Sequence, residues 1–290
     1  MITPDFCIIG GMKCGTTTLA YQLGLQEGVF ITDPKEPNFF SDEENWAKGI
    51  TWYTSLFEAA PEGALLGEAS THYTKWPVHP DAPRRFADYA PDAKLIYMVR
   101  DPVARALSHL RHAWTQREMT GDLETAAREM EILWRYGLYD KQLQNWLDLY
   151  TEEQVLVVAL ERLNRRPQEE FARVLEFLGT EGSWIDAVDD QNQGADRSRK
   201  LPLHGLLVDS PVATALRRAL VPKWVRTKIR EGRQMKSLEV SDEAKAMIAD
   251  HVRDDTERFG KRFGIDGLSP ENFSERVLEK QLNFAGKPNR

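Results

Sequence analysis

Short apolar runs alternate along the chain with longer segments in which apolar residues recur every three or four positions. The runs predict buried strands at residues 6–10, 28–31, 64–67, 94–99 and 154–160. The segments of helical period predict helices at about residues 16–26, 102–118, 138–150 and 168–178. Strands that alternate with helices are typical of a parallel sheet with crossover helices. The expected fold class is therefore α/β, a parallel sheet flanked by helices.

The pattern changes after the last of these helices. Residues 179–202 are polar and contain glycine, which is the composition of a long surface loop, and loops of this length are often lids. Helical segments follow, and one of them is expected to begin at the Ser241 cap and to end near Phe259. We therefore expect a single domain over residues 1–290. Its parts are a core at about 5–180, a lid-like loop at about 180–202 and a helical C-terminal portion at about 203–290.

The composition is that of a soluble globular protein, with 41% hydrophobic and 29% charged residues. A net charge of −7 argues against general binding to nucleic acid or to an anionic membrane, so any anion site has to be local. The apolar runs are too short to span a membrane, and the N-terminus carries no basic leader. Cys7 and Cys14 form neither a disulfide framework nor a metal-ligand spacing. We expect a cytoplasmic protein.

The first predicted strand runs into a glycine-rich turn, G-G-M-K-C-G-T-T-T. Four residues separate Gly10 from Gly15, as in the phosphate-binding loop G-x-x-x-x-G-K-[ST]. The lysine of that motif follows the second glycine, whereas here Thr16 occupies that position and Lys13 lies inside the loop. Backbone N–H groups in such a turn, together with the helix N-terminus, favour an anion. A tight turn whose glycines only permit close packing gives the same pattern.

A second stretch, V-R-D-P-V-A-R-A-L-S-H-L, places Arg100 at the carboxyl end of the predicted strand 94–99. Ligands of open α/β sheets bind beyond the carboxyl ends of the strands. Asp101 is expected to cap the next helix, with Pro102 at its first position and Ser108 further along it. A local basic cluster in this part of the sequence comprises Lys94, Arg100, Arg105, Arg111 and Arg117. A solvated amphipathic helix with its arginines in surface pairs explains the same pattern.

A third stretch, D-P-K-E-P-N-F-F, holds Glu36 directly before Pro37. A residue before proline is restricted toward an extended backbone, and Phe39 and Phe40 can anchor the segment in the core. A general base needs a carboxylate fixed in this way. The alternative is an ordinary glutamate of a surface loop.

Together, the three stretches resemble the sulfotransferases that use 3′-phosphoadenosine 5′-phosphosulfate (PAPS), most closely the heparan-sulfate type and its bacterial relatives. The segment M-K-C-G-T-T-T-L resembles the loop of that family for the 5′-phosphosulfate. The stretch around R-D-P resembles its 3′-phosphate motif, and K-E-P-N-F-F resembles the segment that carries its catalytic base. The resemblance extends from residue 5 to about residue 178.

The resemblance implies a P-loop-containing fold and in-line transfer of a sulfuryl group from PAPS to an acceptor hydroxyl or amine. Glu36 is then the general base, and Lys13 stabilises the leaving phosphate. The implied cofactor-binding residues are Lys13, Cys14, Gly15, Thr16, Thr17, Thr18, Arg100, Ser108, Arg199 and Lys200. A sulfuryl group carries less charge than the phosphoryl group of ATP, so a lysine in the loop serves without a metal ion. The implied acceptor is a small molecule, a lipid or a carbohydrate.

The chain departs from the heparan-sulfate pattern at one point. Those enzymes carry a lysine after the glutamate of a strand-end motif, whereas here Ala69 follows Glu68. Lys35 and Lys75 are the candidates to supply the missing cation. The same stretch contains His72, and because cytosolic sulfotransferases use a histidine base near this point, His72 is the rival of Glu36.

Two other functions fit parts of the pattern. In a P-loop kinase or ATPase, Thr17 would bind magnesium and Asp101 would act as the acidic ligand. The absence of a lysine at position 16, and the arginine at the end of the apolar strand, argue against this interpretation. A non-catalytic nucleotide-binding protein is the third possibility.

Overall fold

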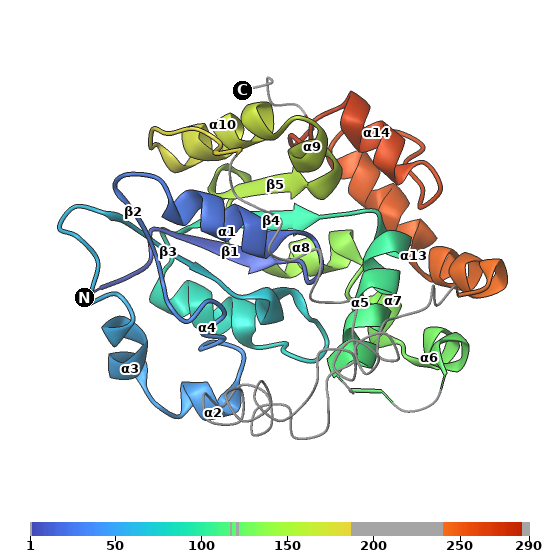
Figure 1. Ribbon diagram of the computed structural model, residues 1–290, viewed down its shortest axis with the longest axis horizontal. Helices are drawn as coiled ribbons and strands as arrows, with labels where there is room; N and C mark the ends of the chain where they lie inside the picture. The colour runs from blue at the N-terminus through green and yellow to red at the C-terminus, as the bar shows by residue number, and fades with distance from the viewer. Residues whose placement is uncertain (1, 117, 120–121, 187–239, 286–290) are drawn as a thin grey trace, which may run out of the picture.

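The computed structural model describes residues 2–116, 118–119, 122–186 and 240–285. Within them, five parallel strands form one sheet in the order β2-β3-β1-β4-β5 (Figure 1). The strands are β1 (Phe6–Gly10), β2 (Val29–Ile31), β3 (Leu65–Ala69), β4 (Lys94–Val99) and β5 (Val155–Ala159). All the strands expected from the apolar runs are confirmed, with small shifts of their ends.

The helices of the α/β core also lie where the helical period placed them. They are α1 (Thr16–Gly24), α5 (Pro102–Gln116), α8 (Tyr139–Leu147) and α10 (Pro167–Leu178). In the C-terminal part, α13 (Asp242–Arg262) begins after Ser241, whose side chain accepts a hydrogen bond from the N–H of Ala244 as an N-cap. Shorter helices connect these elements: α2 (Glu43–Trp46), α3 (Ile50–Ser55), α4 (Ala82–Tyr89), α6 (Leu123–Glu129), α7 (Ile132–Arg135), α9 (Leu160–Arg165), α14 (Phe273–Glu279) and the 3₁₀ turns η1 (Thr71–Thr74) and η2 (Glu152–Gln154).

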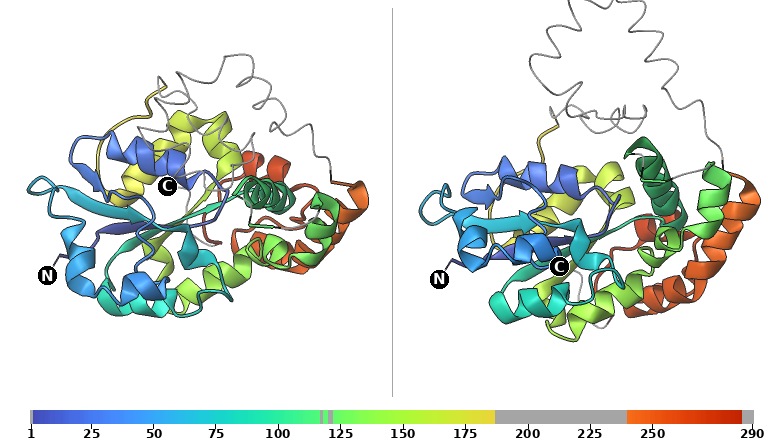
Figure 2. Two further views of the ribbon diagram at one scale, coloured as in Figure 1. Left: turned by 60° about the horizontal axis from the view of Figure 1, so that its bottom comes forward. Right: turned by 90° about the horizontal axis from the view of Figure 1, so that it is seen from below.

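Helices cover both faces of the sheet, as Figure 2 shows from two further sides. Alternate residues of a strand point to opposite faces. In β1, Phe6 and Ile8 belong to the apolar cluster that includes residues of α1 and α10. Cys7 and Ile9 belong to the cluster on the other face, with residues of α4, α8 and α13. Burial on both faces explains why the strands read as continuous apolar runs in the sequence.

A third apolar cluster joins α5, α6, α7 and α13. These helices lie beside the carboxyl ends of β4 and β5, so that part of the C-terminal portion borders the edge at which ligands of such sheets bind (Figure 1). The helical character expected for the C-terminal portion is confirmed at α13 and α14. None of the described helices is both long enough and apolar enough to cross a membrane.

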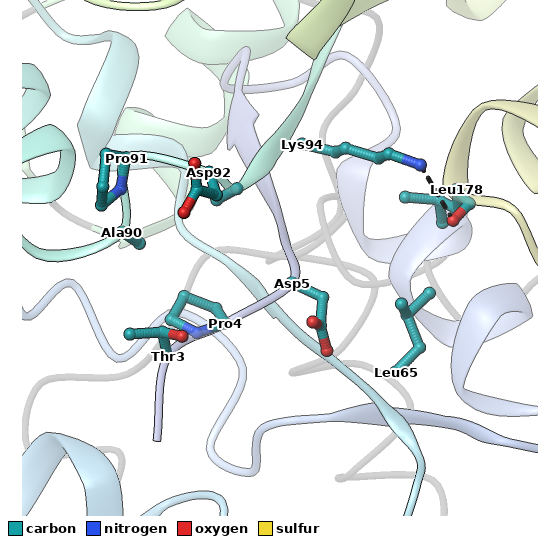
Figure 3. Close-up of a pocket in the computed structure, with 10 residues that line it drawn as sticks. Thr3, Pro4, Asp5, Leu65, Ala90, Pro91, Asp92, Lys94 and Leu178 are labelled. Carbon is teal, nitrogen blue, oxygen red and sulfur yellow. Dashed lines mark hydrogen bonds between the residues drawn. The ribbon is translucent and has the colours of Figure 1, made fainter. Parts of the chain in front are cut away.

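The basic cluster expected around Arg100 is not one surface. Lys94 begins β4 at the opposite edge of the sheet, where its ammonium donates a hydrogen bond to the carbonyl oxygen of Leu178 over 3.2 Å (Figure 3). Asp5 and Asp92 lie near Lys94 around a cavity of about 280 Å³ at this edge. Lys94 and Arg100 lie at opposite ends of the six-residue strand β4, so the interpretation that grouped them in one basic cluster was wrong.

Candidate active site

A cavity of about 770 Å³ lies at the carboxyl edge of the sheet. Its walls come from the β1–α1 loop, the segment after β2, η1, the end of β4, and α5. The residues singled out from the sequence that line it are Lys13, Gly15, Thr16, Thr17, Thr18, Glu36, Arg100 and Ser108. The structure therefore brings the three sequence motifs together around one space.

The glycine-rich loop needs an unusual backbone at two positions. Gly15 has a φ of 86°, and a Cβ atom at this position would lie 2.6 Å from Cδ1 of Leu160. Lys13 has a φ of 66°, in the left-handed region that non-glycine residues rarely adopt. The N–H of Gly11 donates to the carbonyl oxygen of Met98 over 2.7 Å and so holds the loop against β4. Strain of this kind is retained where the surroundings determine the conformation, often at functional sites.

Arg100 is fixed at the end of β4 by its backbone and reaches the loop with its side chain. The Tyr139 hydroxyl donates to the carbonyl oxygen of Arg100 over 2.6 Å, and the guanidinium of Arg100 donates to the carbonyl oxygen of Lys13 over 3.4 Å. Asp101 caps α5, because its Oδ1 accepts from the N–H of Ala104 over 2.8 Å. The capping expected from the sequence is confirmed, and it places Ser108 of α5 in the same cavity as Arg100.

Some of the residues singled out do not reach the cavity. The Cys14 side chain is buried, its Sγ lies 3.8 Å from the Tyr139 hydroxyl, and its backbone N–H donates to Gly11. Burial raises the pKa of the Cys14 thiol to about 11, although Arg105 and Arg100 act in the opposite direction. Arg105 is also buried, and its guanidinium donates to the carbonyl oxygen of Leu133. Arg199 and Lys200 lie outside the described residues.

Glu36 is held by three hydrogen bonds. Its N–H donates to Ala69, and its carboxylate accepts from Thr71 Oγ1 over 2.8 Å and from Lys35 Nζ over 3.0 Å. Burial acts to raise the pKa of Glu36, but the charge of Lys35 and the hydrogen bond from Thr71 outweigh it and lower the pKa. The carboxylate is therefore ionised at neutral pH and ready to accept a proton.

The backbone at Glu36 differs from the expectation. The sequence predicted an extended residue before Pro37, whereas the φ of Glu36 is 64°. The N–H of Glu36 bonds to Ala69 at the end of β3 in this conformation, and the buried Phe39 and Phe40 anchor the segment in the core as expected. The rigid placement was predicted correctly, but the backbone conformation that provides it was not.

The candidates for the missing cation and the rival base lie at the same cavity. Lys75 and His72 both line it, and Lys35 pairs with Glu36. The ring of His72 stacks on His79 at 4.8 Å between centroids. Burial and the charge of Lys75 lower the pKa of His72 to about 4, so its imidazole is neutral at pH 7 and only weakly basic.

Sequence reasoning missed Thr71, His109 and Tyr136, which also line the cavity. Thr71 comes two residues after the carboxyl end of β3, and the position rule that pointed to Arg100 would have found it. His109 follows Ser108 on α5, but Tyr136 lies beyond α7, and nothing in the local sequence indicates that it folds back to this cavity.

The family model of the sulfotransferase domain matches residues 3–243, which is most of the chain. The chain belongs to this sulfotransferase family. Mouse (Mus musculus) heparan sulfate glucosamine 3-O-sulfotransferase 3A1 is 34% identical to it over 185 residues, which cover 61% of this chain and 46% of the mouse protein. Human (Homo sapiens) bifunctional heparan sulfate N-deacetylase/N-sulfotransferase 2 is 27% identical over 197 residues, 61% of this chain and 22% of the human protein.

This sulfotransferase family member spans about half the length, or less, of the curated relatives it matches. Among solved structures, a sulfotransferase from Alicyclobacillus acidocaldarius is similar, with 30% identity and a TM-score of 0.57. That match covers 66% of this chain and 88% of the Alicyclobacillus chain. The family resemblance expected from the three motifs is confirmed.

Proposed function

We propose that this protein transfers the sulfuryl group of PAPS to a hydroxyl or amine of an acceptor. One observation carries the proposal: Lys13, Glu36, and the pair Arg100 and Ser108 come from three separate stretches of the chain and line a single cavity. Family membership supports the same reaction class. Relatives named for sulfation of heparan sulfate make a carbohydrate one candidate acceptor, beside lipids and other small molecules.

The residues of the cavity fit a nucleotide with phosphate groups at two positions. The loop offers the hydroxyls of Thr16, Thr17 and Thr18 and the N-terminus of α1 to a 5′-phosphosulfate. Arg100 and Ser108 face the cavity from the end of β4 and from α5, and they offer a guanidinium and a hydroxyl to a 3′-phosphate. PAPS supplies an activated sulfuryl group when it is bound.

Glu36 accepts the proton of the acceptor as the acceptor attacks. Its carboxylate is already ionised and is held at both oxygens, so no rearrangement is needed before proton transfer. Lys13, inside the loop, stabilises the negative charge that develops on the leaving phosphate. His72 lines the same cavity with a neutral imidazole and is the rival base.

Thermal shift with 3′,5′-adenosine bisphosphate tests the nucleotide site. A ligand that binds only the folded state stabilises it, so we expect the bisphosphate to raise the melting temperature of the protein in the presence of a chelator. Magnesium and ATP together should have little effect on the melting temperature. Transfer of radiolabelled sulfate from PAPS to a mixed panel of carbohydrate, phenol and amine acceptors tests the reaction. Stabilisation only by magnesium–ATP would favour a kinase or ATPase, and nucleotide binding without transfer to any acceptor would favour a non-catalytic protein.

A further inference from the structure

The proposed reaction uses only part of the cavity wall. The residues of the nucleotide part lie on the glycine-rich loop, at the end of β4 and at Ser108 of α5. A second part of the wall, which we call the acceptor wall, consists of His72, Lys75, His109, His112, Glu118 and Tyr136. Glu36 lines the same cavity, so a molecule bound against the acceptor wall shares the space with the candidate base.

Lys75 is the distinctive group of the acceptor wall. Its side chain is half-buried, and its ammonium lies 5.9 Å from the centre of the Tyr136 ring. Within the described part of the chain, no hydrogen bond or ion pair to a protein acceptor engages this ammonium. A half-buried ammonium without a protein acceptor can direct its three donors to a ligand that brings oxygen atoms and negative charge.

The charges around Lys75 leave it available. The charges of Glu36 and Glu118 act on Lys75, but Glu36 forms its ion pair with Lys35 over 3.0 Å, and Glu118 is exposed to solvent. Burial and the charge of Lys75 lower the pKa of His72 to about 4, and burial with the charges of Arg105 and Lys75 lowers the pKa of His109 to about 2. These two imidazoles are neutral at pH 7, so they do not compete with Lys75 for an anion.

The acceptor wall also has a flat aromatic part. The rings of His109 and Tyr136 stack with their centroids 5.6 Å apart and their planes 12° apart, close to Lys75. Stacked rings of this kind favour a planar or apolar surface on the ligand. The acceptor wall thus offers a cation beside an aromatic surface, and a ligand that combines an anionic group with a planar or apolar part fits it.

We propose that Lys75 binds an anionic group of the acceptor and so selects hydroxyl compounds that carry a carboxylate or a similar anion. This inference rests on the proposed function, because it assigns the substrate class of the same site. Lys75 is then a specificity-determining residue rather than part of the nucleotide site. The strand-end motif carries Ala69 and so offers no cation to the cavity, whereas Lys75 lines the cavity and supplies one.

Binding of two matched probes tests the role of Lys75. The probes 4-hydroxyphenylacetate and 4-hydroxyphenylacetamide have nearly the same shape and differ in charge, and calorimetry with protein saturated with 3′,5′-adenosine bisphosphate measures their affinities at pH 7. We expect the carboxylate to bind at least about tenfold more tightly than the amide, as for a hydrogen bond to a charged group. Because burial lowers the pKa of Lys75 to about 8, this preference should decline as the pH rises through that value.

Three variants separate the charge of Lys75 from other effects. Lys75→Met should abolish the preference for the carboxylate, and Lys75→Arg should retain most of it. Lys261→Met removes one positive charge from an exposed lysine of α13 that pairs with Glu257, and it should leave the preference unchanged.

Equal affinity for the two probes, failure of the carboxylate to bind, or a preference that survives in Lys75→Met would overturn the inference. Failure of the bisphosphate to bind contradicts the proposed function itself. A bound bisphosphate without any charge preference contradicts only the role of Lys75.

Discussion

The hydroxyl of Thr71 donates to the carboxylate of Glu36 over 2.8 Å, across 35 positions of the chain. Two neighbouring contacts accompany this one. The N–H of Glu36 donates to the carbonyl oxygen of Ala69, and the N–H of Asn38 donates to the hydroxyl of Ser70. Three consecutive residues at the end of β3 therefore hold the segment that carries the candidate base.

Replacing Thr71 with valine removes this hydrogen bond at nearly constant volume. A hydrogen bond to a carboxylate favours its ionised form, so its loss raises the pKa of Glu36 and moves the acid limb of the pH–rate profile to higher pH. We expect kcat/KM to fall about tenfold, with partial recovery in Thr71→Ser. The control is Thr54→Val, because the Thr54 hydroxyl bonds only within α3 and lies in an exposed region. An unchanged pH profile in Thr71→Val would show that Thr71 does not act through Glu36.

Glu36→Gln keeps the shape of the side chain and removes its ability to accept a proton. We expect transfer to fall by about 10²- to 10⁴-fold, the usual contribution of a general base. Affinity for 3′,5′-adenosine bisphosphate should change little, because the residues proposed to contact the nucleotide come from other segments. Rates of sulfate transfer and calorimetry on the same preparation measure both effects. Full activity in Glu36→Gln would transfer the role of base to His72, and His72→Ala would then be inactive.

Gly15→Ala tests the geometry of the loop. The substitution places a Cβ atom 2.6 Å from Leu160 in a left-handed residue, whereas at Gly28, with a similar φ of 77°, nothing lies within 4 Å of the added atom. The left-handed backbone costs about 1–2 kcal/mol in either variant. We expect a larger loss of unfolding free energy in Gly15→Ala than in Gly28→Ala, as measured by urea denaturation. Only Gly15→Ala should weaken the thermal shift produced by the bisphosphate, and equal binding by both variants would argue against an anion site in the loop.

The sequence alone predicted the sheet, the main helices and the residues of the cavity that come from local motifs. Apolar runs indicated the strands because both faces of the sheet are buried, and the Asp101 cap marked the start of α5. The direction in which individual side chains point was harder to predict from the sequence. Cys14 and Arg105 lie within recognisable motifs, but packing turns Cys14 into the core, and the backbone of Leu133 accepts from Arg105. Tyr136 reaches the cavity only through the packing of α7 against α5, which depends on residues far apart in the chain.

Glu68 predicts a dependence of stability on pH. Its side chain is completely buried in β3, and burial raises its pKa from the ordinary 4.5 to about 7, although hydrogen bonds from neighbours such as Cys7 and Ser70 act in the opposite direction. Between these two values the folded state binds a proton that the unfolded state does not. The contribution of Glu68 to stability is therefore lost as the pH rises from about 4.5 to about 7.

The neutral variant Glu68→Gln should lack this dependence. From pH 5 to pH 8 the wild type should lose up to about 3 kcal/mol of unfolding free energy through Glu68, and Glu68→Gln should not show this loss. Urea denaturation of both proteins at the two pH values measures the difference. A pH dependence identical to that of the wild type would mean that the Glu68 carboxyl does not titrate in this range in the folded protein.

The left-handed backbone at Lys13 and Glu36 has a consequence for directed evolution of this protein. Glycine adopts such a backbone without steric penalty, so glycine at either position relaxes the chain while it deletes an amine or a carboxylate that the proposed chemistry uses. A laboratory screen for heat resistance that ignored turnover would tend to enrich these replacements and yield a sturdier but inert protein. Engineering for durability should therefore hold both positions constant and seek its gains elsewhere.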